Sequence, residues 1–209
     1  MKLIGISGKS YAGKDTCAEI FKNILPDTII VAFADELKRM VARIVGCSPH
    51  DLYDQAFKAL HIPGFIKVTD KRSGEITHVI KEAELIYKDA YHKTYTDVTY
   101  REALQFFGEK CRKVFGRDYW IKVVDEFVRG TSHDVCIIPD VRYINEAEYI
   151  SSKNGILVRV NRPLESQSYG DHASETELDN YPFTYVINNN TDLDALEKEI
   201  KILIHKANL

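Results

Sequence analysis

The sequence has little of what metal clusters, membrane spans and highly charged binding surfaces require. Its four cysteines are scattered without a CxxC pair, which argues against a zinc site and favours reduced thiols. No apolar run approaches membrane-spanning length, and no signal peptide precedes the first expected strand. With 28 basic and 31 acidic residues the formal net charge is -3, so no general attraction to nucleic acid or membrane is expected. We therefore expect a cytoplasmic protein in which any phosphate binding is local.

The composition is that of an ordinary globular protein. Its 209 residues can bury one sizeable core, and 44% of them are hydrophobic and 28% charged. Strand-like and helix-like segments alternate along the chain, which predicts an α/β fold with a central parallel sheet. We expect one domain, with a core at 1–59 and 97–209 and an insertion at about 60–96 that contains a hairpin.

A phosphate-binding motif lies at the N-terminus. An apolar strand from Leu3 to Ile6 leads into the loop GKSYAGK and then into a helical pattern that extends to Phe21. This order of strand, loop and helix fits the GxxxxGK motif, whose amides and lysine bind a polyphosphate at the positive end of a helix dipole. The expected phosphate-binding residues are Gly8, Ser10, Ala12, Gly13, Lys14, Asp15 and Thr16.

The residue that would contact a metal ion is left open between two neighbours. The usual motif has Ser or Thr directly after the lysine, whereas here Asp15 follows Lys14 and the hydroxyl of Thr16 comes one position later. Either oxygen is suitable for Mg²⁺, bound directly or through a water molecule. Both are therefore candidates.

Further candidates follow the expected second strand and lie in a later helix. Asp35 follows the strand from Thr28 to Phe33, so Asp35 and Lys38 are expected near the phosphate loop; Asp35 is either a helix N-cap or an acceptor for a sugar hydroxyl. A helix that begins with the capping box Thr99 to Glu102 carries Arg101 and Gln105 as candidate substrate contacts.

The second half of the chain adds residues at the same expected edge of the sheet. The run DVCIIPD ends in Asp140, and Arg142 and Glu146 follow, so all three are expected where parallel strands end. A polar stretch at about 162–180 has the composition of a lid. The remaining candidates are Trp120 in a helix, Arg162, His172 and Glu175 in the lid, and Asn189 after the last strand.

Six segments together resemble the phage deoxynucleoside monophosphate kinases, a branch of the P-loop kinases. They occur in the order of that family and span nearly the whole chain except for the insertion. They are GKSYAGKDT (8–16), FADELK (33–38), REALQFFGEKCR (101–112), DVRYINEA (140–147), HASE (172–175) and VINNNT (186–191).

The resemblance implies a three-layer P-loop kinase fold that transfers the γ-phosphoryl of ATP to the 5′-phosphate of a deoxynucleoside monophosphate (dNMP). Lys14 would bind the donor phosphates, with Mg²⁺ near Asp15, Thr16 and Asp140. Arg101, Arg142 and Arg162 would neutralise phosphoryl charge, and Asn189 would border adenine. The other dNMP contacts implied are Asp35, Lys38, Gln105, Trp120, Asp140 and Glu146.

Two other functions are open at this point. A small-molecule kinase resembling dephospho-coenzyme A kinase would share the fold and the lid, and a panel of acceptors would separate the two. A non-catalytic nucleotide-binding switch would bind nucleotide tightly without turnover. The expected partners are ATP and deoxynucleoside monophosphates, with a homodimer as an alternative to the monomer.

Overall fold

The computed structural model describes residues 1–82, 92–163 and 173–209. It divides into two compact units. The first comprises Met1–Phe33 with Asp118–Leu209, and the second comprises Ala34–Arg117. The expected organisation as one domain with an insertion at about 60–96 stays a prediction, and each unit is described here by itself.

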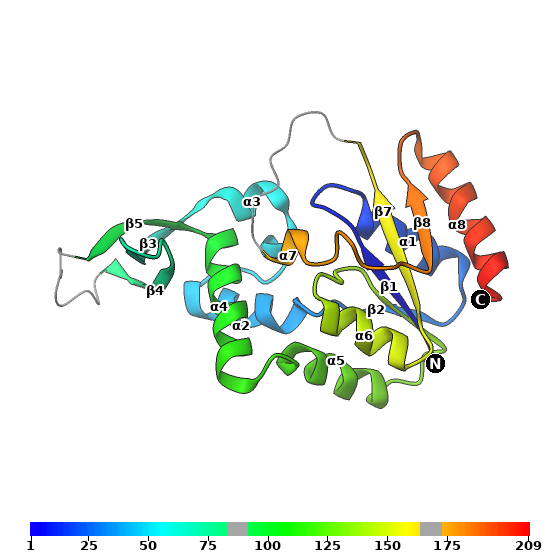
Figure 1. Ribbon diagram of the computed structural model, residues 1–209, viewed down its shortest axis with the longest axis horizontal. Helices are drawn as coiled ribbons and strands as arrows, with labels where there is room; N and C mark the ends of the chain where they lie inside the picture. The colour runs from blue at the N-terminus through cyan, green and yellow to red at the C-terminus, as the bar shows by residue number, and fades with distance from the viewer. Residues whose placement is uncertain (83–91, 164–172) are drawn as a thin grey trace. The chain divides into compact units, whose positions relative to one another are not determined.

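A five-stranded sheet forms the centre of the first unit (Figure 1). Each pair of neighbouring strands is parallel, and the core strand β1 pairs with β6 on one side and β7 on the other, so that Ile4 lies opposite both Ile137 and Ile156. This confirms the expected central parallel sheet. In spatial order the strands are β2 (Thr28–Ile30), β6 (Val135–Ile138), β1 (Lys2–Ser7), β7 (Ile156–Asn161) and β8 (Tyr185–Asn188).

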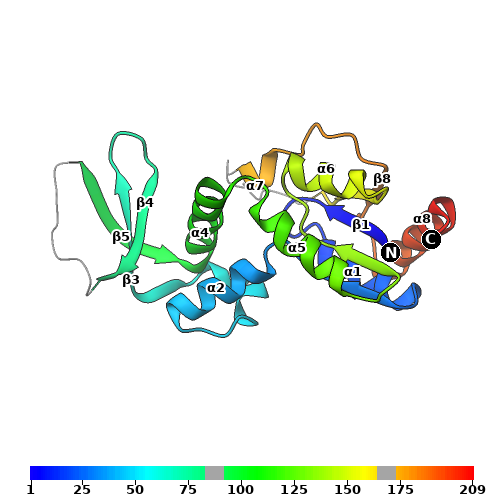
Figure 2. The same ribbon diagram turned by 90° about the horizontal axis from the view of Figure 1, so that it is seen from below.

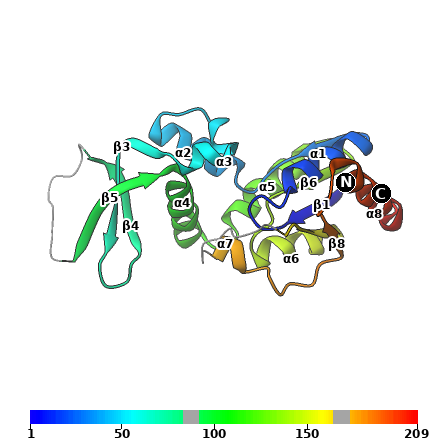
Figure 3. The same ribbon diagram turned by 90° about the horizontal axis from the view of Figure 1, so that it is seen from above.

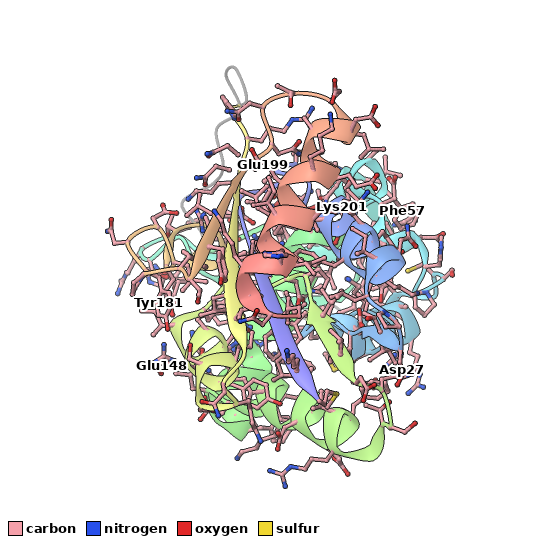
Figure 4. The ribbon with its side chains drawn as sticks, turned by 90° about the vertical axis from the view of Figure 1, so that its right-hand side faces the viewer. Asp27, Phe57, Glu148, Tyr181, Glu199 and Lys201 are labelled. Carbon is pink, nitrogen blue, oxygen red and sulfur yellow. The ribbon has the colours of Figure 1, made fainter. Side chains whose placement is uncertain are left out.

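Helices cover both faces of this sheet. Along β1, Ile4 and Ile6 belong to one apolar cluster together with Phe21 of α1 and Ile200 of α8. Figure 4 shows α8 lying across the sheet, with Glu199 and Lys201 on that helix. The helices of the first unit are α1 (Lys14–Ile24), α5 (Tyr119–Gly130), α6 (Ile144–Ser152), α7 (Ala173–Thr176) and α8 (Leu193–Ala207).

The opposite face of the sheet is packed against α6. A Cβ added at Gly5 would lie 2.4 Å from a side-chain carbon of Ile150, because alternate residues of β1 point to opposite faces. Helix α5 lies beside α6, where the Tyr149 hydroxyl donates to Asp125 at 3.0 Å. The first unit therefore has the three layers that were expected, with the sheet between two layers of helices.

The second unit combines helices with a three-stranded antiparallel sheet in the order β4-β3-β5 (Figure 2). The expected hairpin is confirmed, and Gly74 adopts a positive φ of 72° in its turn. Strand β5 was not foreseen, because it pairs with β3 and not with a strand that a tight turn joins to it. The elements are α2 (Asp35–Val45), η1 (Asp51–Tyr53), α3 (Gln55–Ala59), β3 (His61–Asp70), β4 (Ile76–Lys81), β5 (Lys93–Thr99) and α4 (Tyr100–Phe115).

Helix α4 begins where the sequence indicated. The Thr99 side chain accepts a hydrogen bond from the Glu102 amide at 3.2 Å, and the Glu102 carboxylate accepts one from the Thr99 amide at 2.9 Å. This capping box satisfies amides that the helix itself leaves without partners. Glu102 also forms an ion pair with Lys67 of β3, which ties the start of the helix to the antiparallel sheet.

The cysteines are free, as expected. Cys17 and Cys136 are buried, and burial raises the pKa of each thiol to about 12, so both remain protonated at neutral pH. Within the described parts of the chain, every helix is too short or too polar to cross a membrane.

Candidate functional site

The loop between β1 and α1 is bent by two residues with positive φ. Tyr11 has a φ of 61° and Gly13 one of 95°, and the Ala12 amide donates to the Lys9 carbonyl at 3.2 Å. Left-handed residues in a short loop turn successive amides toward one concave side, which is the geometry that binds anions. The strand, loop and helix predicted from the sequence are therefore present, and α1 begins at Lys14.

Glycine is required at two positions of this loop. A Cβ at Gly8 would lie 2.6 Å from the Val160 carbonyl oxygen, so the loop can pass strand β7 only without a side chain there. At Gly13 a Cβ would lie 2.5 Å from the side-chain nitrogen of Asn189. Close packing alone therefore accounts for glycine at these two positions of the motif.

Asn189 directly follows β8 and contacts the loop between β1 and α1. Its side chain is 8% exposed and donates from Nδ2 to the Ala12 carbonyl at 3.0 Å. This contact fixes the residue that precedes Gly13, so Asn189 positions the phosphate loop. The expected contact between Asn189 and adenine stays a prediction.

Replacing Gly13 by alanine is expected to lower the free energy of unfolding by about 1–3 kcal/mol, because it adds strain at positive φ and a clash with Asn189. In an Asn189→Ala background the clash is gone, and Gly13→Ala should then cost less. Urea unfolding followed by the fluorescence of Trp120, the single tryptophan, would measure both, because Trp120 lies in the same unit. Additive effects in the double variant would contradict this explanation.

Lys14 lies at the first position of α1 and is 9% exposed. Its ammonium donates to the Lys9 carbonyl at 2.8 Å, which bends the side chain back over the loop. Burial, and next the positive charge of Arg142, lower the pKa of Lys14 to about 8. A desolvated ammonium in this position attracts an anion more strongly than one in water. Asp15 and Thr16, the neighbouring candidates for a metal contact, are exposed on the same turn.

Three further predicted residues follow β6 in the first unit: Asp140, Arg142 and Glu146. Asp140 accepts a hydrogen bond from the Phe33 amide at 2.8 Å, which links the ends of β2 and β6. Arg142 follows in the loop before α6, and its side chain is 30% exposed. The charges of Arg142 and Asp140 both act on Lys14, so these groups share one electrostatic environment, as the sequence predicted.

Glu146 and Trp120 have structural contacts. Glu146 is 2% exposed, and its carboxylate accepts from the amides of Arg142 at 2.8 Å and Tyr143 at 3.1 Å. It therefore shapes the loop that carries Arg142 and caps the start of α6. Trp120 is 2% exposed and packs edge to face against Tyr119. A contact of either residue with a nucleotide stays a prediction.

Glu175 lies in α7, in the last part of the expected lid, and contacts the phosphate loop. Its carboxylate accepts from the Ser10 amide at 3.2 Å and from Arg142 at 2.5 Å. Burial alone would raise the pKa of this carboxyl, but the adjacent Arg142 outweighs it and holds the pKa below its usual value. Glu175 was expected in the lid, and the structure gives it definite partners in the loop and after β6.

Sequence reasoning missed three charged residues beside this loop. Asp179 accepts from Lys9 at 2.7 Å and from Arg159 at 3.1 Å, and Arg159 also donates to the Ser7 hydroxyl at 3.3 Å. Arg159 left a signal in the sequence, since an arginine within the apolar strand ILVRV needs a partner. Lys9 and Asp179 left none, because charged residues in polar loops are ordinary.

Four predicted residues lie in the second unit. Asp35 accepts from the Tyr53 hydroxyl at 2.5 Å and lies 3.7 Å from Lys38, whose ammonium is 3.5 Å from the centre of the Tyr53 ring. Asp35 is the first residue of α2 and Ala34 is its N-cap, so the N-cap alternative for Asp35 is wrong by one position. Arg101 donates to Gln55 at 2.9 Å. The roles of Asp35, Lys38, Arg101 and Gln105 toward substrate stay predictions.

Two lid residues remain. Arg162 is exposed just beyond the end of β7, and its contact with a phosphoryl group stays a prediction. His172 lies outside the described residues.

Fold and site together define a class of protein. A parallel sheet between helices, with a glycine-bearing loop and a buried lysine after a central strand, is consistent with a P-loop kinase-like fold. Residues 48–200 match the family Deoxynucleotide monophosphate kinase, which is more than half of the chain. The chain belongs to this family.

Other comparisons add little. A structure of TT1252 from Thermus thermophilus is 14% identical with a TM-score of 0.45, and the match covers 98% of this chain and 97% of that one. A likeness this distant says nothing about function. Comparison with curated proteins found no match.

Proposed function

We propose that this protein transfers the γ-phosphoryl of ATP to the 5′-phosphate of a deoxynucleoside monophosphate, giving ADP and a deoxynucleoside diphosphate. The observation that carries the proposal is the position of the buried Lys14 ammonium in a charged cluster with Arg142 beside the phosphate loop. The acceptor phosphate is already anionic, so the difficulty of the reaction is to bring two polyanions together in line rather than to remove a proton.

Each cation has a distinct part in this proposal. The loop amides and Lys14 bind the β- and γ-phosphates of the donor, and Arg142 binds the acceptor phosphate or the transferring group. A guanidinium suits that position because two of its N–H groups can bind two phosphate oxygens. Arg162 would add charge from the lid. Lys14 is hydrogen-bonded to the Lys9 carbonyl and Arg142 to Glu175, so both cations lie beside the loop before substrate arrives.

The residues at the site also suit a magnesium ion. Asp15 and Thr16 present exposed oxygen atoms on the first turn of α1, and Asp140 places a carboxylate at the end of β6. Oxygen donors of this kind, directly or through water, are those that Mg²⁺ prefers. Bound there with ATP, Mg²⁺ would neutralise charge on the β- and γ-phosphates.

A coupled assay of ADP release would test the proposed function. ATP and magnesium are supplied with dAMP, dGMP, dCMP, dTMP, the ribonucleotides and dephospho-coenzyme A as separate acceptors. Turnover on one or more deoxynucleotides supports the proposal. Turnover on dephospho-coenzyme A alone, or ATP binding without turnover on every acceptor, would contradict it.

The pKa of Lys14 predicts a pH dependence. The charged groups that act on it are Arg142, Glu175, Asp15 and Asp140. Above a pKa of about 8 the free protein loses the ammonium, so the affinity for ATP should fall with rising pH, by at most about tenfold per pH unit. Calorimetric titration with ATP between pH 6.5 and 9.5 would measure it.

The lowered pKa of Lys14 also makes the free energy of unfolding depend on pH. Unfolded Lys14 keeps its proton up to its ordinary pKa of 10.5, whereas the folded protein releases it at about 8. The unfolded state therefore binds more protons between these values, and the contribution of Lys14 to the free energy of unfolding rises with pH across that window.

The control for the affinity measurement is Lys14→Arg, which keeps its charge and should lack the fall in ATP affinity. A wild-type affinity that is constant up to pH 9.5 would contradict the assignment.

A further inference from the structure

Three carboxylates at every second position, in α7 and just after it, contact the edge of the sheet that carries the phosphate loop. We call Glu175, Glu177 and Asp179 the acidic triplet. Glu175 binds the Ser10 amide and Arg142, as described above, and Glu177 accepts from the Ile144 amide at 2.9 Å, at the start of α6. Figure 3 shows α7 beside the N-terminal end of α6. The triplet therefore holds one short segment against three parts of this edge.

Asp179 forms the third attachment. Its Oδ1 lies 2.6 Å and its Oδ2 2.7 Å from the Lys9 ammonium, and its Oδ1 lies 3.1 Å from Arg159. The Lys9 ammonium also donates to the backbone carbonyl of Glu175. Asp179 is 40% exposed, so each of its ion pairs contributes little alone. Together the contacts of Lys9 and Asp179 keep the Glu175 side chain close to the phosphate loop.

Glu175 binds the groups that the proposed function assigns to phosphate. Its Oε2 accepts from the Ser10 amide at 3.2 Å, and its Oε1 accepts from the Ser10 hydroxyl at 3.4 Å and from Arg142 at 2.5 Å. In the proposed reaction the loop amides bind the donor phosphates, and Arg142 binds the acceptor phosphate or the transferring group. One carboxylate thus spans the position where the phosphoryl group would pass between them.

A phosphate and the Glu175 carboxylate require the same donors. Each N–H can make one strong, well-directed hydrogen bond, so a phosphate oxygen at the Ser10 amide must displace the carboxylate, and one that takes the same N–H of Arg142 must displace it there too. A glutamate that only oriented Arg142 would have no need of the Ser10 amide. The double contact favours competition with phosphate over simple support of the arginine.

We propose that Glu175 is an internal competitor for the phosphoryl position, which the phosphates of the substrates displace. This inference rests on the proposed function, because it takes the Ser10 amide and Arg142 as phosphate-binding groups. Binding of ATP then includes the cost of releasing the carboxylate. The apparent affinity for ATP equals the intrinsic affinity multiplied by the fraction of molecules in which Glu175 has released its partners. The acidic triplet thereby sets the nucleotide affinity of the loop.

The test compares two Glu→Gln variants that change the charge equally. Glu175→Gln keeps the size of the side chain but removes the anion, and it should lower the Kd for ATP at least about fivefold. Glu148→Gln is the matched control, because Glu148 is exposed on α6 (Figure 4), and its Kd should equal that of the wild type. Isothermal titration with ATP and with inorganic tripolyphosphate would measure both.

A second variant and a second measurement keep the inference testable if Glu175→Gln folds poorly. Asp179→Asn weakens the attachment without removing the competing anion, so it should tighten ATP binding by a smaller factor. Hydrogen exchange of residues 174–180 should become faster when ATP is added to the wild-type protein, because the segment is released. Slower or unchanged exchange there would contradict the proposal.

The outcomes separate this inference from the proposed function. If Glu175→Gln binds ATP as weakly as the wild type or more weakly, Glu175 supports the site instead of competing, and the inference is wrong while the proposed function stands. If the wild type and all variants fail to bind ATP and tripolyphosphate, the proposed function fails and the inference fails with it.

Discussion

Lys14→Ala is expected to reduce kcat/KM for ATP by about 10²–10³-fold, because it removes a cation that acts on the charge of the transferring phosphoryl group. The ammonium lies over the loop and is largely removed from water, where its interaction with phosphate is least screened. The coupled ADP-release assay, with the acceptor that the wild type uses best, would measure the loss.

Stability should not explain that loss. Burial lowers the pKa of Lys14, which means that the folded protein holds the ammonium at a cost to its free energy of unfolding. Lys14→Met, which keeps the volume without the charge, should therefore leave the unfolding midpoint in urea unchanged or raise it. Lys122→Ala on α5 is the control, since Lys122 is exposed and its loss should not affect turnover. Activity within tenfold of the wild type in Lys14→Met would argue against the proposed role.

The sequence was most informative where the local pattern alone determines the structure. The loop from Gly8 to Lys14 and the capping box at Thr99 both have fixed spacings with a physical cause, and both were found where expected. The parallel sheet was also predictable, because apolar runs such as Leu3 to Ile6 alternate with helical segments.

The remaining features depend on contacts between residues that are far apart in the sequence. Glu175 binds Ser10 across 165 residues, and Asn189 binds Ala12 across 177, and no local pattern records such pairs. Strand β5 was missed for a related reason, since it pairs with β3 and not with a neighbour joined by a tight turn. Charged residues in polar loops acquire their partners only when the chain folds.

Arg142→Ala is expected to reduce kcat/KM by about 10²–10³-fold, because no other group of its loop can bind two phosphate oxygens from the same position. Arg142→Lys keeps the charge but not the planar pair of donors, so it should recover only part of the activity. Arg129→Ala is the control, since Arg129 is exposed on α5, where it pairs with Asp125. A loss of less than tenfold in Arg142→Ala would show that Arg142 does not bind a phosphoryl group in the transition state.

The loss could also arise indirectly, because Arg142→Ala leaves Glu175 without its cation. Glu175 is 11% exposed, and an unpaired carboxylate there should lower the free energy of unfolding by about 1–3 kcal/mol. The double variant Arg142→Ala with Glu175→Gln removes that unpaired charge and should regain most of the stability, measured by urea unfolding. If the guanidinium itself acts on phosphate, the kcat of the double variant should remain as low as that of Arg142→Ala, even where its affinity for ATP is higher. Recovery of kcat in the double variant would instead assign the loss to the Glu175 carboxylate left without Arg142. The double variant differs from Arg142→Ala only in one side-chain oxygen of Glu175, which a nitrogen replaces.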